Sequence, residues 1–181
     1  MSHNAELVIH PATRSGAVRR IAAAIERDAA DMRVSFEVEG DIAGLRLPET
    51  AEAMRTDSLW QHSCFEAFLR PDGGDSYYEF NFASSSAWAA YRFAARREER
   101  ELPDFAAPAI ACRRGSDSFA MTARLPLAGL PELAGAAVIH VGLTAVIEDA
   151  RGMLSYWALA HASREPDFHD PATFRLRLPA P

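Results

Sequence analysis

Hydrophobic and polar residues alternate along much of the chain, and this pattern predicts β-strands. Residues 32–38 place Met, Val, Phe and Val in alternation with Arg, Ser and Glu. Residues 78–82 and 174–178 show the same period of two. Because successive side chains of a strand point to opposite faces of a sheet, we expect each segment to bury one face and expose the other.

Turn-forming residues separate neighbouring apolar segments and predict three hairpins. The first turn reads Pro-Asp-Gly-Gly-Asp, the second Gly-Ser-Asp-Ser and the third Glu-Asp-Ala-Arg-Gly. The third hairpin begins with a segment that is apolar at nearly every position, which is typical of a strand covered on both faces. The hairpins are expected to pair residues 64–69 with 77–82, 110–114 with 119–125, and 138–147 with 153–160.

Residues 18–28 are compatible with either a helix or a strand. Their alanine content favours a helix, whereas Ile21, Ala23 and Ile25 also alternate as in a strand. We predict a strand, because the rest of the chain is rich in strands. With an opening strand near residues 7–9, the total is about nine to eleven strands. The expected fold is all-β, a two-sheet antiparallel β-sandwich that forms one domain over residues 1–181.

Composition narrows the range of functions. The chain has 181 residues and a formal net charge of −6, and all 19 of its basic residues are arginine. An acidic chain without a basic run does not suit nucleic-acid binding. No apolar run is long enough for a transmembrane helix, and the N-terminus lacks a signal-peptide pattern. Cys64 and Cys112 fit no disulfide or metal motif. We therefore expect a cytoplasmic protein that binds neither nucleic acid nor membranes, and its oligomeric state stays open.

Polar residues stand out in segments that are otherwise aromatic. Glu66 lies between Phe65 and Phe68, and an unpaired charge there must face solvent, a cavity or a partner. Tyr77, Glu79 and Asn81 share one strand face, which is expected to point away from the core side. These side chains are also explained by an ordinary aromatic core with structural ion pairs.

Three segments resemble a bacterial DOMON-like family that is related to the type 9 carbohydrate-binding modules. They read LWQHSCFEAFLRP, YYEFNFASSSAWAAYRF and SYWALAHASREPDFHDPATFRLRL. The resemblance extends over most of the chain. It implies a β-sandwich of two antiparallel sheets, and a terminal saccharide held between two tryptophans with carboxylate, amide and arginine partners.

The resemblance also implies which residues would form such a site. Trp60 and Glu66 look like its first half, Arg92 resembles its arginine, and Trp157 is similar to its second tryptophan. An indole stacks on the apolar face of a pyranose, and charged or amide groups bind its hydroxyls. The full candidate ligand-binding set is Trp60, His62, Glu66, Glu79, Asn81, Arg92, Trp157 and His161.

We therefore expect a non-catalytic module that binds a saccharide or a sugar-like metabolite. One alternative is a haem-binding domain, with ligands drawn from Met32, Met54, Met121, Met153, His62, His140, His161 and His169. Another is a structural or interaction domain without a small-molecule ligand. Glycosidases use carboxyl pairs such as Glu66 and Glu79 would form, but the chain lacks a nucleophile motif, so we do not expect an enzyme.

A metal site is a further hypothesis. Asp167, His169 and Asp170 supply oxygen and nitrogen ligands in one loop, and His161 lies nearby in the sequence. A hydrogen-bonded loop is the favoured explanation of the same residues. The resemblance to sugar-binding modules adds a structural calcium ion elsewhere as another expectation.

Overall fold

The computed structural model describes residues 2–181 and consists almost entirely of β-strands. Among these residues, the strands are β1 (Ser2–Ile9), β2 (Val18–Arg27), β3 (Asp31–Gly40), β4 (Cys64–Pro71), β5 (Tyr77–Phe82), β6 (Trp88–Phe93), β7 (Ala109–Arg114), β8 (Ser118–Pro126), β9 (Val138–Glu148), β10 (Leu154–Ala158) and β11 (Leu176–Pro179). The helical elements are short: η1 (Ile42–Gly44), η2 (Leu59–Gln61), α1 (Pro131–Ala134) and η3 (Pro171–Thr173). None of the helices in this part of the chain has the length and hydrophobicity needed to cross a membrane.

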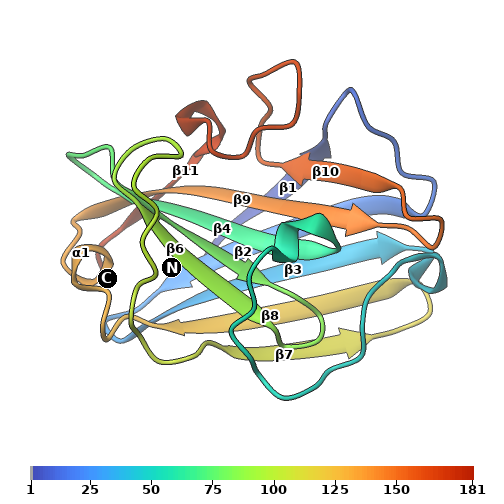
Figure 1. Ribbon diagram of the computed structural model, residues 1–181, viewed down its shortest axis with the longest axis horizontal. Helices are drawn as coiled ribbons and strands as arrows, with labels where there is room; N and C mark the ends of the chain where they lie inside the picture. The colour runs from blue at the N-terminus through green and yellow to red at the C-terminus, as the bar shows by residue number, and fades with distance from the viewer. Residues whose placement is uncertain (1) are drawn as a thin grey trace.

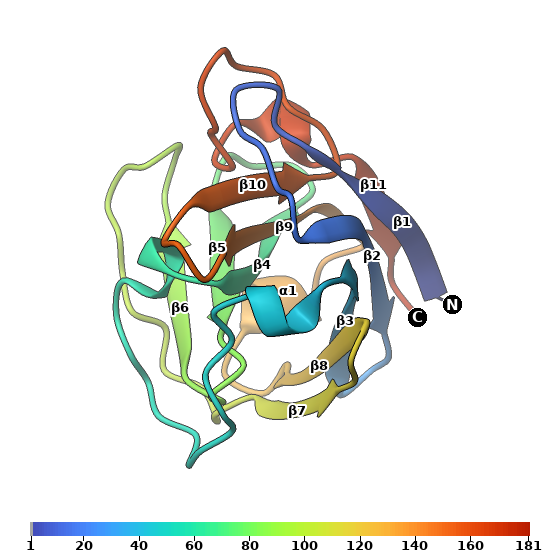
Figure 2. The ribbon, with the colours of Figure 1, turned by 90° about the vertical axis from the view of Figure 1, so that its right-hand side faces the viewer.

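The strands form two layers that belong to one curled sheet (Figures 1 and 2). The front sheet has the order β6-β5-β4-β9-β10, with β11 paired to the other half of β9. The back sheet has the order β1-β2-β3-β8-β7. The two layers are continuous because β1 pairs with β2 over residues 2–7 and with β10 at Val8 and Ile9. All pairings between these strands are antiparallel, so the predicted antiparallel all-β fold is confirmed.

The main hydrophobic core lies between the two layers. Phe65 of β4 contacts Phe36 of β3 and Phe119 of β8, with ring centroids 5.2 and 5.7 Å apart. Alternate residues of β2, β3, β4, β8 and β9 point into this core and are buried. Removing these aromatic and aliphatic surfaces from water is the main driving force for the fold.

The three predicted hairpins are present as β4-β5, β7-β8 and β9-β10. Residues 18–27 form β2, which confirms the strand prediction against the helix propensity of its alanines. The neighbouring strands explain this outcome, because β2 pairs along most of its length with β1 and β3. Residues 88–93 form β6, a strand that the sequence pattern did not predict.

The outer faces of the two sheets differ. Side chains of the front sheet that point away from the main core form a second aromatic cluster, which includes Phe68, Tyr77 and Phe93. Residues 163–175 cover this cluster, and Phe174 packs so close to Gly142 that a Cβ atom there would lie 2.7 Å from its ring. β9 is therefore buried on both faces, as its apolar sequence predicts. The outer face of the back sheet has no such cover.

Candidate functional site

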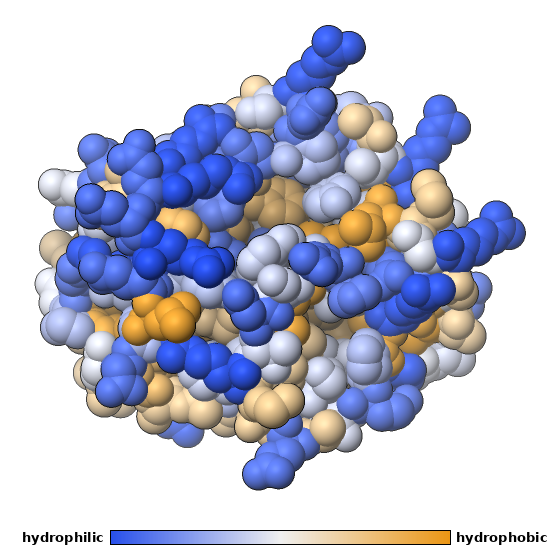
Figure 3. Space-filling model, in the orientation of Figure 1, coloured by the Kyte–Doolittle hydropathy of each residue, from blue (hydrophilic) through white to orange (hydrophobic). Residues whose placement is uncertain are grey.

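A cavity of about 520 Å³ lies on the outer face of the front sheet. We call it the front cavity. Figure 3 shows this side of the molecule, where hydrophilic side chains surround a recess. Strand residues form its floor and inner wall: Glu66, Phe68, Glu79, Tyr91, Phe93, Val146 and Tyr156. Loop residues form its rim: Trp60, Arg97, Arg100, Pro166, Phe168 and His169.

Strand alternation determines which side chains reach the cavity. Glu66 and Phe68 are two residues apart on β4, so both point away from the main core. On β5, Glu79 lies opposite Phe68 in the pairing register, and Asn81 lies opposite Glu66. Carboxyl and amide groups of neighbouring strands are thereby placed side by side on the cavity floor.

Glu66 is a buried carboxyl group with one unpartnered oxygen. Its side chain is 2% exposed. Thr144 donates a hydrogen bond to Oε2 at 3.0 Å, whereas Oε1 has no hydrogen-bond partner among the described residues. Burial, together with the nearby Glu79 charge, raises the pKa of Glu66 from 4.5 to about 8. A buried polar atom without a hydrogen-bond partner is costly, which makes this oxygen a candidate ligand contact.

Glu79 and Asn81 continue this polar floor. Asn81 Nδ2 donates to Glu79 Oε1 at 2.8 Å, and Asn81 Oδ1 is a second buried acceptor without a partner in residues 2–181. Burial raises the pKa of Glu79 to about 7, although the hydrogen bond from Asn81 opposes that shift. The floor therefore holds two carboxyl groups whose ionisation is suppressed by their surroundings.

His169 closes one side of the cavity as a neutral imidazole. Its Nδ1 lies 2.7 Å from the Tyr77 hydroxyl, which also accepts the backbone N–H of Arg97 at 3.2 Å. The Tyr77 proton is then free to go to Nδ1, so Nε2 carries the ring hydrogen and faces Glu79 Oε2 at 3.6 Å. Burial lowers the pKa of His169 to about 4, because it disfavours the charged form.

Aromatic rings and arginines form the mouth. Trp60 is 37% exposed, and its ring lies edge-on to Tyr91 with centroids 6.1 Å apart. The Tyr91 hydroxyl donates to Asp57, and the Arg100 guanidinium lies 4.8 Å above the Tyr91 ring. Arg97 lies at the same rim. An accessible indole at the mouth of an apolar cavity is suited to stacking on a ligand.

Ion pairs connect the two loops that form the rim. Arg96 pairs with Asp167, and Arg97 Nη2 lies 3.1 Å from the same carboxylate. Asp170 lies 3.6 Å from Arg96 and caps η3 by accepting the Ala172 N–H. The metal candidates Asp167 and Asp170 thus contact arginines, and His169 contacts Tyr77. Within residues 2–181, no three His, Cys, Asp or Glu side chains are grouped to hold a metal ion, so the described side chains do not form the metal site expected at Asp167, His169 and Asp170. The structural calcium ion stays a prediction.

The structure brings three of the eight predicted ligand-binding residues to the cavity wall: Trp60, Glu66 and Glu79. Asn81 lies beneath them, hydrogen-bonded to Glu79. His62 is exposed and its Nδ1 lies 2.8 Å from Glu148 Oε2, on the β9 side outside the cavity. His161 donates from Nε2 to the Val8 carbonyl at 2.9 Å. It contacts the cavity only indirectly, through Phe168.

Arg92 and Trp157 do not reach the cavity, because each lies one residue away from the position that does. On β6, Tyr91 and Phe93 face the cavity, so Arg92 points to the other side and pairs with Glu132 at 2.7 Å. On β10, Tyr156 lines the cavity, whereas Trp157 is buried in the main core with Nε1 donating to Ser155 at 3.0 Å. The expected pair of tryptophans around one site is therefore not formed.

Sequence reasoning missed several residues of the cavity wall. Recognising 88–93 as a strand would have placed Tyr91 on the same face as Phe93 and away from Arg92. Arg97, Arg100 and Phe168 come from loops, and the sequence contains no periodic signal for where a loop side chain points. These residues became candidates only when the folded chain brought the loops together.

The methionines proposed as haem ligands lie away from the front cavity. Met32 and Met121 are buried in the main core, and Met54 and Met153 are each 64% exposed on the surface. His169 lines the cavity, but its two ring nitrogens face Tyr77 and Glu79. Among the described residues, no methionine lines the front cavity, so this cavity does not offer a methionine and histidine pair for haem.

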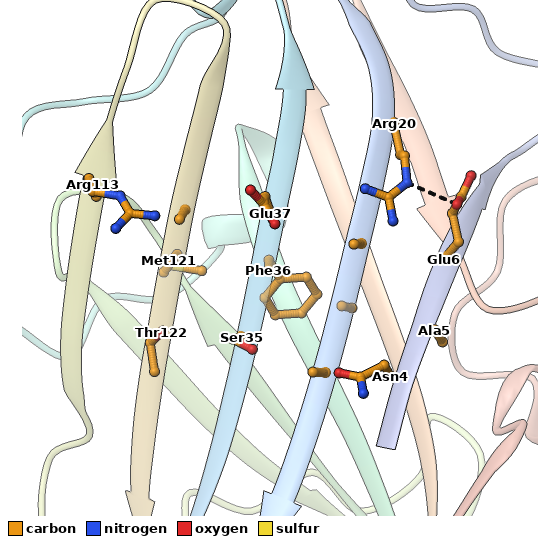
Figure 4. Close-up of a pocket in the computed structure, with 14 residues that line it drawn as sticks. Asn4, Ala5, Glu6, Arg20, Ser35, Phe36, Glu37, Arg113, Met121 and Thr122 are labelled. Carbon is orange, nitrogen blue, oxygen red and sulfur yellow. Dashed lines mark hydrogen bonds and ion pairs between the residues drawn. The ribbon is translucent and has the colours of Figure 1, made fainter. Parts of the chain in front are cut away.

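A second hollow, of about 580 Å³, crosses the outer face of the back sheet (Figure 4). We call it the back trough. Its centre is lined by small side chains, including Ala22, Ala24, Ser35 and Ala120, and charged residues lie at its edge. Glu6 and Arg20 form a solvent-exposed ion pair there, with 2.9 Å between Glu6 Oε2 and Arg20 Nε. No buried polar atom without a partner belongs to the residues that line this trough.

Proteins of known structure share the fold. A candidate carbohydrate-binding protein from Bacteroides uniformis ATCC 8492 matches with a TM-score of 0.75 and 16% sequence identity, over 99% of this chain and 86% of that chain. Two structures of family 9 carbohydrate-binding modules from Caldicellulosiruptor kristjanssonii match with TM-scores of 0.54. The one in complex with cellotriose is 12% identical and covers 96% of this chain and 81% of its own. The one in complex with glucose is 11% identical and covers 97% and 83%.

No protein-family model and no curated protein sequence matches the chain. At sequence identities this low, similarity to solved structures establishes the fold alone. Function has to be argued from the residues of the front cavity.

Proposed function

We propose that this chain is a non-catalytic saccharide-binding module and that the front cavity is its binding site. One observation carries the proposal. The floor of an aromatic-walled cavity contains Glu66, a buried carboxyl group with an unpartnered oxygen. Such a group is expensive to maintain unless a ligand supplies the missing hydrogen bond.

The chemistry of the cavity suits a saccharide. A pyranose ring has an apolar face of C–H groups and a rim of hydroxyls. Trp60 at the mouth offers an accessible aromatic surface for that face, and Tyr156 and Phe168 extend the apolar wall. Glu66, Asn81 and Glu79 offer acceptors for hydroxyl groups. A volume of about 520 Å³ lies within the range of ordinary small-ligand pockets.

The structural neighbours support a binding role. Two of them are carbohydrate-binding modules in complex with cellotriose and glucose. We infer that this chain binds the same class of ligand, a saccharide, but we do not transfer the neighbours' ligand contacts to it. The present site has one tryptophan at the cavity, so stacking is assigned to Trp60 alone.

Calorimetric titration with a panel of mono- and disaccharides tests this proposal. We expect saturable binding by the wild-type protein. Trp60→Ala should weaken the affinity by about tenfold or more, because it removes the stacking surface. Calorimetry is needed because Trp60→Ala also removes the fluorophore nearest the ligand.

Trp157→Phe is the matched control, since Trp157 lies in the main core and away from the cavity. It should retain the wild-type affinity if its thermal unfolding curve shows a folded protein. Absence of binding across the panel, or equal affinity in the wild type and Trp60→Ala, would contradict the proposal. In wild-type protein the tryptophan fluorescence change should come from Trp60, because Trp88 and Trp157 are buried.

A further inference from the structure

When its carboxyl groups are ionised, the cavity floor presents almost only acceptors. Glu66 Oε1 and Asn81 Oδ1 have no donor, although Glu66 is 2% exposed and Asn81 is fully buried. Glu79 Oε2 lies 3.6 Å from His169 Nε2, which is beyond hydrogen-bond distance. The Nδ2 donor of Asn81 is directed to Glu79 Oε1.

Hydroxyl groups can donate to such a floor, but they match it less completely than an ammonium group does. Each sugar hydroxyl donates one hydrogen bond and also has lone pairs that need donors. A protonated amine has three donors and no acceptor. It can therefore donate hydrogen bonds to several floor oxygens, and it has no lone pair that needs a donor. The floor is therefore better matched to an ammonium group than to a hydroxyl group.

The balance of charge favours the same ligand. No basic side chain is paired with Glu66 among residues 2–181, and both floor carboxyls are buried. The arginines at the rim have acidic partners of their own. Arg97 lies 3.1 Å from Asp167, and Arg100 lies 3.9 Å from Asp57. A ligand cation would supply the positive charge that the floor lacks, and hydrogen bonds to charged groups are the stronger class.

We propose that the front cavity selects an amino sugar, with its protonated amine bound by Glu66, Asn81 and Glu79 and its ring stacked on Trp60. This proposal rests on the proposed saccharide-binding function and adds the class of saccharide. Binding involves no covalent step. The ammonium group occupies the floor, and the hydroxyl groups of the ring remain toward the rim.

Calorimetry with three closely related sugars tests the proposal. Glucosamine carries the amine, glucose has a hydroxyl in its place, and N-acetylglucosamine has a neutral amide there. At pH 7.5 most of the amine is still protonated, as expected of a group with a pKa near that of an α-amino group, about 8, and Glu79, with a pKa of about 7, is mostly ionised. We expect wild-type protein to bind glucosamine about tenfold or more tightly than either neutral sugar, the size of a charge-assisted hydrogen bond.

Glu66→Gln locates the effect at the floor. It keeps the shape of the side chain but cannot ionise against the ligand amine, so the preference for glucosamine over glucose should fall to about twofold or less. Glu37→Gln is the matched control, because Glu37 is exposed on the back sheet beside the back trough. It should retain the full preference.

The outcomes separate the two proposals. Equal binding of glucose and glucosamine, both lost in Trp60→Ala, would overturn the amino-sugar proposal and leave the saccharide-binding function intact. A preference for glucosamine that persists in Glu66→Gln would also overturn it, because the amine would then be bound elsewhere. No binding of any of the three sugars or of the wider saccharide panel would overturn both.

Discussion

The front cavity and the back trough have similar volumes, about 520 and 580 Å³, but their polar groups lie in opposite environments. In the back trough, charged side chains lie at the surface, and Arg20 pairs with both Glu6 and Glu39. In the front cavity, Glu66 and Glu79 are buried, and no arginine among residues 2–181 hydrogen-bonds to either carboxyl group. Size alone therefore does not distinguish a binding site from a hollow in a sheet.

The difference indicates which of the two regions lowers the folding stability of the protein. An exposed ion pair such as Glu6 and Arg20 contributes little to folding and costs little to maintain. A buried carboxyl with an unpartnered oxygen lowers stability until something binds to it. Sites that bind ligands commonly carry this kind of penalty, whereas sheet surfaces without a ligand do not need it.

The largest expected effect concerns the dependence of stability on pH. The folded-state pKa of Glu66, about 8, lies above its ordinary value of 4.5, so the native state binds the proton more tightly than the unfolded state. The free energy of unfolding should therefore fall as the pH rises toward 8, by about 2 kcal/mol between pH 6.5 and 8. Glu79 adds a fall in the same direction up to about pH 7. Urea unfolding at a series of pH values measures this slope.

Glu66→Gln should flatten the slope above pH 7 and make the protein more stable than wild type at pH 9. Glu37→Gln, on the back sheet, should leave the slope unchanged. The range above pH 6.5 avoids the opposite contribution of His169, whose low native pKa makes stability fall with decreasing pH below its ordinary value of 6.5. Parallel slopes in the wild type and Glu66→Gln would show that Glu66 is not held protonated.

A smaller effect is expected at the rim. Asp167 accepts hydrogen bonds from Arg96 and Arg97 and from the His169 backbone, so it connects the two loops beside the cavity. Asp167→Asn should lower the free energy of unfolding by about 1 kcal/mol, because these bonds are partly shielded from solvent. Hydrogen exchange of residues 94–101 should become faster in the variant.

Glu6→Gln is the matched change at the back trough. It removes one carboxylate from an exposed ion pair with Arg20, and the expected loss is below about 0.5 kcal/mol. Equal losses in the two variants would mean that the rim contacts are no stronger than the surface pairs of the back sheet.

Most of the fold could be predicted from the sequence, because period-two alternation and turn residues reflect the local chemistry of strands and hairpins. Glu66 was recognised for the same reason, since a lone carboxyl in an apolar strand needs a special environment. Arg92 and Trp157 were attractive by residue type, but strand parity decides which face a side chain occupies. A shift of one residue moves it to the other side of the sheet.

The rim could not be predicted in this way. Arg97, Arg100 and Phe168 lie in loops that meet only because β6 and residues 163–175 are adjacent in the folded chain. Their positions depend on long-range packing and on ion pairs such as Arg97 with Asp167. Neither hydrophobic periodicity nor local propensity contains this information.

The most direct test of the difference between the two hollows is a set of ¹H–¹⁵N correlation spectra of wild-type protein titrated with glucosamine. We expect saturable shifts at the Trp60 indole N–H, at the Asn81 side-chain amide and at the backbone of Thr144 and Val146. Ala22, Ala24 and Ala120 in the back trough should not shift. Shifts at the back trough with an unchanged front cavity would contradict the assignment of the binding site.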